Sequence, residues 1–187
     1  MKIYKTGIIG CGGIAQKMAA TLEKMKGVER YAVASRNQEK AEAFANKWGF
    51  TKAYGSYEEL ASDPEVDLIY IATPHAMHYD NAHMCIEKGK PVLCEKAFTA
   101  NARQAEDLLA FAKEKGVFIT EAIWTRYMPL SLKIQELLKE GVIGTPYTLS
   151  ANLSYPISNK ERIIRPELAG GALLDIGVYT LNFAALV

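Results

Sequence analysis

The chain has 187 residues, with 22 basic and 21 acidic side chains, and hydrophobic residues make up 49% of it. This is the composition of an ordinary folded protein and excludes extensive disorder. The net charge of +1 argues against a dedicated binder of nucleic acid or of acidic membranes, and no apolar run approaches the roughly 20 residues that span a bilayer. We therefore expect neither nucleic acid nor a membrane as partner.

The cysteine count indicates the cellular setting. Three cysteines leave one unpaired in any disulfide scheme, which suits a reducing compartment better than a disulfide scaffold. We therefore expect a cytoplasmic protein.

Short apolar segments alternate with helical patterns up to about residue 120. Residues 67–72 are apolar almost throughout, as expected of a parallel strand that is covered on both faces. The β-α-β-α rhythm predicts an α/β fold, a doubly wound parallel sheet with helices on both faces. The expected strands are 5–9, 29–34, 67–72, 91–94 and 117–120. The expected helices are 14–25, 38–48 ending at Gly49, a short helix after Ser56, 76–87, and a helix that opens at Asn101. The last of these is expected to bury Ala105, Leu108, Leu109 and Ala112.

After residue 121 the pattern changes. An apolar stripe predicts a helix around 130–138, residues 147–155 alternate as in a strand that is covered on one face, and 171–186 resemble an apolar helix. One strand and two helices do not complete a layer. We therefore expect a complete domain over 1–121, and over 122–187 the beginning of a second domain of a longer protein. Its uncovered apolar stripe predicts association into a homodimer or higher oligomer.

A glycine-rich turn lies between the first strand and the first helix. The segment Gly10-Cys11-Gly12-Gly13-Ile14-Ala15 matches G-x-G-x-x-A. In this pattern the first glycine makes the turn, the second lets a pyrophosphate approach the backbone, and the small last residue allows close helix–strand packing. The turn predicts dinucleotide binding, and a purely structural turn is the alternative. The expected contacts are Gly10, Gly12, Gly13, Ile14 and Ala15.

The end of the second expected strand indicates which dinucleotide binds. An NAD-specific site usually has Asp or Glu here to accept from the ribose 2′-hydroxyl, whereas this chain has Ser35 and Arg36. A hydroxyl and a guanidinium suit a 2′-phosphate, which a carboxylate would repel. NADP(H) is therefore favoured, with NAD(H) as the alternative if Arg36 is only a solvated loop charge.

Five motifs in this order resemble the glucose–fructose oxidoreductase / inositol dehydrogenase / MocA family (Gfo/Idh/MocA). The branch of dimeric dihydrodiol dehydrogenase and NADP-dependent xylose dehydrogenase is the most similar. The resemblance implies a Rossmann domain followed by an α+β substrate domain with a large, mostly antiparallel sheet, which this chain only begins. The motifs are the glycine turn, Thr73-Pro74-His75 with His78, Cys94-Glu95-Lys96, residues 121–126 (EAIWTR) and residues 170–179 (GGALLDIGVY).

The resemblance also implies the catalytic residues. Lys96 would lie beside the nicotinamide, where an ammonium stabilises negative charge on the substrate oxygen. Asp175 and Tyr179, spaced i and i+4, would share one helix face. Tyr179 would exchange the substrate proton while Asp175 orients the substrate or the lysine. A buried aromatic is the alternative for Tyr179, and a surface lysine is the alternative for Lys96.

Further cofactor contacts are implied on both sides of the domain boundary. They are Thr73, Pro74, His75 and His78 after the central strand, Glu95 with Lys96, and Trp124 and Arg126 at the start of the second domain. For Trp124 a place in the core is the alternative. The histidines at 75, 78 and 83 with Cys85 do not converge at metal-ligand spacing, so no metal site is expected.

Together, these features predict an oxidoreductase that moves hydride between NADP(H) and a secondary alcohol or carbonyl of a sugar, polyol or cyclic trans-diol. The alternative is a non-catalytic NAD(P)-binding protein or the cofactor-binding half of such an enzyme. One departure from the family is Ala97, where most members have a proline that would stiffen the turn after Lys96.

Overall fold

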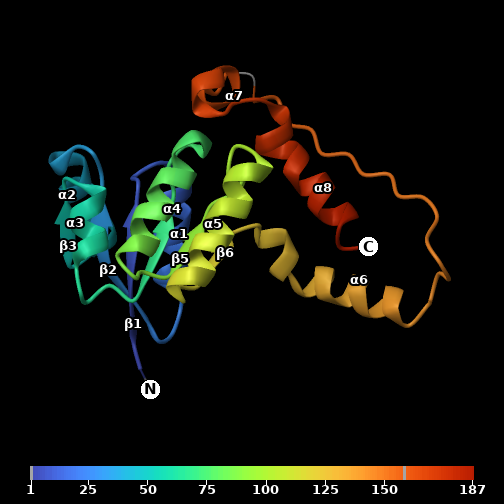
Figure 1. The fold of residues 1–187 in the computed structure, drawn as a ribbon, viewed down its shortest axis with the longest axis horizontal. Helices are drawn as coiled ribbons and strands as arrows, with labels where there is room; N and C mark the ends of the chain where they lie inside the picture. Colours follow the sequence, from blue (N-terminus) through green and yellow to red (C-terminus); the bar gives the residue numbers. More distant parts are fainter. Residues whose placement is uncertain (1, 158) are drawn as a thin grey trace. The chain divides into compact units, whose positions relative to one another are not determined.

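A computed structural model describes residues 2–157 and 159–187, and the chain divides into two compact units, Met1–Glu121 and Ala122–Val187 (Figure 1). The first unit is built on a six-stranded sheet in the order β3-β2-β1-β4-β5-β6, in which every neighbouring pair is parallel. The predicted doubly wound sheet is therefore confirmed. The strands are β1 Tyr4–Ile9, β2 Val28–Ala34, β3 Lys52–Tyr54, β4 Leu68–Ile71, β5 Val92–Cys94 and β6 Ile119–Glu121.

Helices connect these strands and begin and end at residues suited to those positions. The Asn37 side chain accepts from Lys40 N at the start of α2, and Gly49 ends that helix in the left-handed conformation. Asn101 accepts from Gln104 N at the start of α5. The helices are α1 Gly13–Leu22, α2 Gln38–Trp48, α3 Tyr57–Ser62, the 3-10 turn η1 His75–Met77, α4 His78–Glu87 and α5 Ala102–Lys115.

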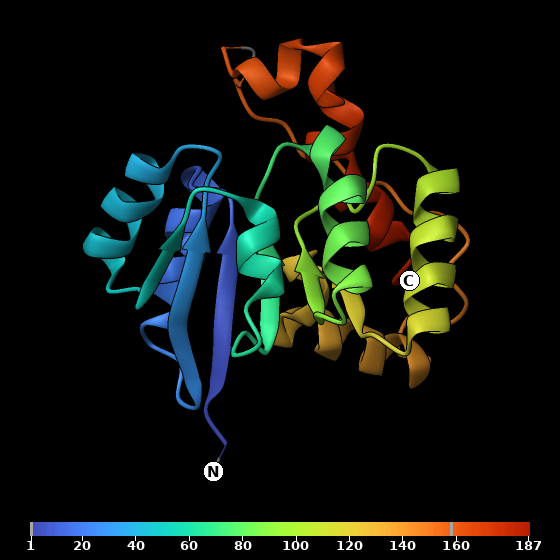
Figure 2. The same ribbon diagram turned by 60° about the vertical axis from the view of Figure 1, so that its left-hand side comes forward.

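Helices α3, α4 and α5 pack on the sheet through one shared core, and α4 and α5 run side by side in both views (Figures 1 and 2). That core joins Leu60 of α3, Ile86 of α4 and Leu108 of α5 to Ile9, Ile69 and Val92 of the strands. All six side chains are fully buried. A parallel sheet covered in this way leaves its carboxyl edge as the place where loops from several strands meet.

Two details of the first unit differ from the prediction. Leu109 is 50% exposed, so its predicted burial is wrong, because α5 turns only Leu108 and Ala112 fully toward the core. Strand β3 was not predicted, since three residues are too few for a periodic pattern.

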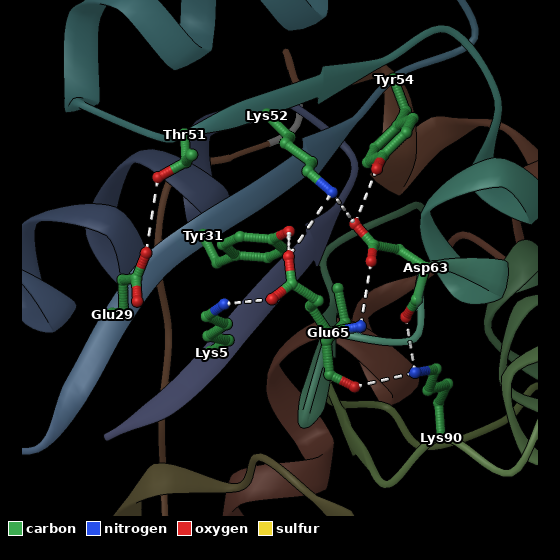
Figure 3. Close-up of polar contacts among 10 residues, drawn as sticks. Lys5, Glu29, Tyr31, Thr51, Lys52, Tyr54, Asp63, Glu65 and Lys90 are labelled. Carbon is green, nitrogen blue, oxygen red and sulfur yellow. Dashed lines mark hydrogen bonds and ion pairs between the residues drawn. The ribbon is translucent and has the colours of Figure 1, made fainter. Parts of the chain in front are cut away.

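A cluster of polar side chains connects β3, Asp63 after α3, the segment 65–66 and Lys90 before β5 (Figure 3). Asp63, only 6% exposed, accepts from Lys52 Nζ at 2.9 Å, from Tyr54 Oη at 2.7 Å and from Glu65 N at 3.0 Å. The Lys90 ammonium donates to the carbonyl oxygens of Asp63 and Val66. Burial alone would raise the pKa of Asp63, but the hydrogen bonds from Lys52, Tyr54 and Glu65 N and the charge of Lys52 together outweigh it and lower the pKa to about 2.

Replacing Asp63 with asparagine is expected to lower the free energy of unfolding by about 2 kcal/mol at pH 7, because a charge-assisted acceptor is lost. A carboxyl whose pKa is lowered by folding stabilises above its unfolded value near 4 and loses that contribution as the pH falls toward 2. Urea unfolding between pH 7 and pH 3 should therefore show the two proteins converging. Glu114→Gln, at an exposed position of α5, serves as control, and equal stability of D63N and wild type at pH 7 would contradict the account.

The second unit is made of short helices. Its elements are η2 Trp124–Tyr127, α6 Pro129–Lys139, α7 Glu161–Ile164, η3 Pro166–Leu168, the π-helical turn η4 Leu173–Gly177 and α8 Val178–Ala184. Gly170 is packed so closely that a Cβ there would lie 2.6 Å from Arg165 O and 2.7 Å from Ile163 O. Only glycine fits this position, and it holds α7 close to the chain that leads into η4.

The strand predicted over 147–155 is not formed, and this prediction is wrong. The segment has no regular structure, and Tyr147 is 93% exposed. A strand needs a hydrogen-bonded neighbour, and the described part of the second unit contains none. The antiparallel sheet implied by the resemblance is likewise not seen there.

Two further observations concern the whole described chain. Cys11, Cys85 and Cys94 are free thiols, the last two buried. A search of the described residues finds no helix with the length and apolar character of a membrane span.

Candidate functional site

The glycine turn has the geometry that its sequence predicts. Gly10 has φ +97°, and a Cβ there would lie 2.9 Å from the Ala72 carbonyl oxygen, so no other residue fits. Its amide donates to Ala34 O at 2.9 Å, which joins the turn to β2. Ala15 is fully buried, as close helix–strand packing requires. The first and last positions of the motif are therefore explained by packing alone.

The middle of the turn is open to a ligand. Gly12 caps α1 without a side-chain hydrogen bond to the first-turn amides, and nothing lies within 4 Å of a Cβ built on Gly13. Ile14 is exposed beside them. Helix N-terminal amides that no capping side chain bonds, together with the positive end of the helix dipole, suit an anion such as a pyrophosphate.

The end of β2 combines a buried hydroxyl with exposed cationic groups. Ser35 is buried, and its Oγ accepts from Asn37 N at 3.4 Å. Arg36 is exposed beside Tyr57; burial raises the pKa of that phenol, and the Arg36 guanidinium opposes the rise. Cys11 is influenced by Lys40 in a similar way: burial raises the pKa of the Cys11 thiol, and the charge of Lys40 opposes that rise. The loop thus offers positive charge at the carboxyl end of β2.

The turn after β4 is held by His78. His78 has no exposed surface; its Nδ1 lies 2.7 Å from Ala97 O and its Nε2 lies 2.9 Å from Thr73 O. Thr73 Oγ1 also accepts from Asn81 Nδ2, and His75 is buried beside them. A side chain with no exposed surface has nothing to offer a dinucleotide, so we correct the direct cofactor contact predicted for His78. It connects the loop after β4 to the loop after β5.

The charge of His78 follows from its surroundings. Burial lowers its pKa to about 4, although the hydrogen bonds to the Ala97 and Thr73 carbonyls act in the opposite direction. The ring is therefore neutral at pH 7 and donates through one nitrogen at a time.

Glu95 and Lys96 follow β5 at the same edge of the sheet. Both side chains are half-buried, and the Glu95 carboxylate accepts from Lys96 N at 3.2 Å and from the Tyr70 hydroxyl. Burial raises the pKa of Glu95. The peptide bond between Lys96 and Ala97 is cis. Within the first unit, the glycine turn, Ser35–Arg36, the Thr73 turn and Lys96 therefore all lie at the carboxyl ends of β1, β2, β4 and β5.

Two residues at this edge were not predicted as site residues. Tyr70 lies within β4 and reaches Glu95, and Glu121 ends β6 and accepts from Phe98 N at 2.9 Å. Glu121 belongs to the motif 121–126. A carboxylate at the end of an apolar strand was the sequence signal that could have identified it as a site residue. No sequence signal identifies Tyr70, which is one apolar residue among several in its strand.

In the second unit, Tyr179 and Trp124 come together. Trp124 Nε1 donates to Tyr179 Oη at 3.1 Å, and the two rings meet at 65° with centroids 6.1 Å apart. Trp124 is 57% exposed and is therefore not a core residue. Arg126 Nε donates to Asn182 Oδ1 at 3.3 Å, and Arg126 and Tyr179 both line a hollow of about 200 Å³. Met128, Leu130, Ile134 and Phe183 line the same hollow, so it is largely apolar, with Arg126 and Tyr179 among its few polar groups.

Asp175 has a partner that the sequence did not suggest. It is buried in the π-helical turn and forms an ion pair with Arg162, whose Nη2 lies 3.1 Å from Oδ2. The i, i+4 spacing to Tyr179 therefore spans a π-helical turn that runs into α8 rather than one regular helix. Across residues 2–157 and 159–187, no three His, Cys, Asp or Glu side chains gather as metal ligands would.

Comparison with known protein families gives two matches. Residues 4–122 match the model described as "Oxidoreductase family, NAD-binding Rossmann fold", and residues 131–187 match the GFO/IDH/MocA C-terminal domain.

Individual proteins extend this similarity over nearly the whole chain. It is 44% identical to D-xylose 1-dehydrogenase (NADP(+)) of Hypocrea jecorina, over 96% of this chain and 51% of that protein. It is 40% identical to trans-1,2-dihydrobenzene-1,2-diol dehydrogenase of Xenopus tropicalis, over 98% of this chain and 56% of that protein. Among solved structures, KijD10, a 3-ketoreductase from Actinomadura kijaniata in complex with NADP, matches with a TM-score of 0.85 and 32% identity, over 99% of this chain and 56% of that one. The chain thus spans about half the length of these relatives.

Proposed function

Because the chain belongs to the Gfo/Idh/MocA oxidoreductase family, we propose that it binds NADP(H) and serves hydride transfer to or from a secondary alcohol or carbonyl carbon. The observation that carries the proposal is the carboxyl edge of the sheet, where an open glycine turn, the Arg36 loop and Lys96 follow β1, β2 and β5. In open α/β sheets this edge is where ligands bind.

The residues present fit an NADP cofactor. The pyrophosphate would lie over Gly12 and Gly13, where the structure leaves space and no side chain caps the amides of α1. The 2′-phosphate would meet Ser35 and Arg36. Thr73, Pro74 and His75 would border the nicotinamide half together with Glu95–Lys96. Trp124 and Arg126 are proposed as further cofactor contacts.

When bound, the nicotinamide supplies or accepts the hydride. The Lys96 ammonium is proposed to stabilise negative charge that develops on the substrate oxygen, and Tyr179 to exchange the hydroxyl proton of the substrate. In the reduction direction the Tyr179 hydroxyl would give its proton to the substrate oxygen, to which Lys96 would donate a hydrogen bond. In the oxidation direction the Tyr179 phenolate would take that proton back. Asp175 is proposed to orient this arrangement through the segment that carries Tyr179.

The names of the relatives support the substrate class. The relatives are named as a dehydrogenase of D-xylose, a dehydrogenase of a trans-diol and a 3-ketoreductase, names that indicate a sugar, a diol and a ketone. We infer a sugar, polyol or cyclic trans-diol for this chain as well. A cytoplasmic homodimer or higher oligomer, associating through the second unit, completes the proposal.

Cofactor choice gives the first test. Replacing Arg36 with alanine is expected to raise the Kd for NADPH by about tenfold to thirtyfold and to change the Kd for NADH by less than about twofold, because only NADPH has the 2′-phosphate. The measurement is a titration of the 187-residue chain with each nucleotide, followed by nicotinamide fluorescence and calorimetry.

The matched control is Arg103→Ala, which removes an exposed arginine of α5. Equal affinity of the wild-type chain for both nucleotides would contradict the role of Arg36 and leave the fold argument intact. Binding of neither nucleotide would contradict the proposed function itself.

A further inference from the structure

The peptide unit between Ala97 and Phe98 is held at both of its polar atoms. Its carbonyl oxygen lies 2.7 Å from His78 Nδ1, and its N–H donates to Glu121 Oε1 at 2.9 Å. These two partners come from α4 and from β6, elements that lie far apart in the sequence. When the neutral His78 ring has its proton on Nδ1, this peptide plane is bonded on both sides and its orientation is fixed. The peptide lies directly after Ala97, the residue that follows Lys96.

The position of Glu121 explains how its carboxylate reaches this loop. Glu121 is the last residue of β6 and pairs in register with Cys94, the last residue of β5. The loop from Glu95 to Phe98 leaves β5 next to it. A half-buried carboxylate costs desolvation, which a charge-assisted hydrogen bond to a backbone N–H offsets. The apolar side chain common at strand ends would avoid that cost but would leave the Phe98 N–H without this acceptor.

The neighbouring contacts indicate what the bond controls. Glu95 accepts from Lys96 N, and Cys94 Sγ lies 3.7 Å from Phe98 O. Protein groups therefore meet the backbone at the N–H of Lys96, the C=O of Ala97, and the N–H and C=O of Phe98. The Glu121 carboxylate reaches this loop from β6, the strand next to β5.

We propose that Glu121 is a positioning residue for Lys96: by holding the Ala97–Phe98 peptide it fixes the backbone from which the lysine extends. The inference rests on the proposed role of Lys96 in hydride transfer. Glu121 acts through the loop and need not touch the substrate. Its removal should therefore affect the placement of the ammonium in the transition state more than the binding of the nucleotide.

The first test measures the loop itself. In the 187-residue chain, Glu121→Ala is expected to speed hydrogen exchange of the Phe98 amide by about tenfold or more, with much less effect on core amides such as that of Val33. Glu121→Gln keeps an oxygen that accepts from the amide and should preserve most of the protection. Exchange that rises equally at Phe98 and Val33 would mean general destabilisation and would overturn the inference.

The second test uses turnover by the natural full-length protein. Glu121→Ala is expected to lower kcat by about tenfold to a hundredfold, with KM for substrate and Kd for NADPH within about threefold of wild type, and Glu121→Gln should recover most of kcat. Glu114→Ala, at an exposed position of α5, is the control.

The outcomes separate the two proposals. If Lys96→Ala loses turnover while Glu121→Ala keeps it, the positioning inference alone is overturned. If Lys96→Ala turns over normally, the proposed role of Lys96 fails and the inference fails with it.

Discussion

Replacing Lys96 with alanine is expected to lower kcat by about a thousandfold, while the Kd for NADPH stays within about threefold of wild type. The reason is electrostatic. Lys96 is half-buried at the carboxyl edge of the sheet, and its ammonium is proposed to stabilise negative charge on the substrate oxygen, which develops only in the transition state. Steady-state kinetics with the full-length protein, together with a separate nucleotide titration, measure the two quantities.

Lys113→Ala is the matched control, because Lys113 is an exposed lysine in the last turn of α5. It should leave both kcat and Kd unchanged. A Lys96→Ala protein with equal losses in nucleotide affinity and turnover would assign the lysine to cofactor binding instead of to transition-state stabilisation.

Replacing Tyr179 with phenylalanine is expected to lower kcat by about a hundredfold or more, because the hydroxyl that would exchange the substrate proton is removed. The ring remains, so its edge-on packing against Trp124 is preserved while the Trp124 Nε1–H loses its acceptor. That loss costs little, since Trp124 is exposed to water. The kinetic effect should therefore come without a large change in the thermal unfolding temperature.

Tyr147→Phe provides the control, since the Tyr147 side chain is almost fully exposed. It tests whether loss of any tyrosine hydroxyl in the second unit affects turnover. Wild-type kcat in Tyr179→Phe would contradict the assignment of the proton transfer and leave the nucleotide site unaffected.

The sequence predicted the sheet because the determining signals are local. Apolar runs such as 67–72, the cap at Asn101 and the glycine at position 49 each act within a few residues of the chain, and the structure confirms all three. The glycine turn could also be predicted, since a Cβ at position 10 would lie too close to Ala72 O and glycine is required there.

The errors arose where the structure depends on distant partners. Residues 147–155 alternate as a strand does, but alternation supplies no neighbour to bond with, and the segment has no regular structure. Leu109 has the spacing of a core residue on α5, yet which stripe of a helix faces the core is decided by how the helix packs on the sheet.

The candidate site divides in the same way. Ser35 and Arg36 were predicted as site residues from the end of a strand, and Lys96 from the end of a strand together with the family resemblance; the structure places all three at the carboxyl edge of the sheet. The contacts to the loop after Lys96 could not be predicted, because His78 and Glu121 reach the Ala97–Phe98 peptide from α4 and β6. The ion pair of Arg162 with Asp175 depends likewise on packing around Gly170 that no spacing rule describes.

The most direct test of the central proposal is to follow the hydride itself. The full-length protein would be incubated with NADP⁺ and a panel of sugars and trans-diols deuterated at the carbinol carbon, and the NADPH formed would be analysed by mass spectrometry and NMR. The account predicts deuterium at C4 of the nicotinamide, on one face of the ring, and none with Lys96→Ala beyond trace amounts. A protein that binds NADPH tightly but transfers no deuterium from any member of the panel would contradict it and would favour a nucleotide-binding role without catalysis.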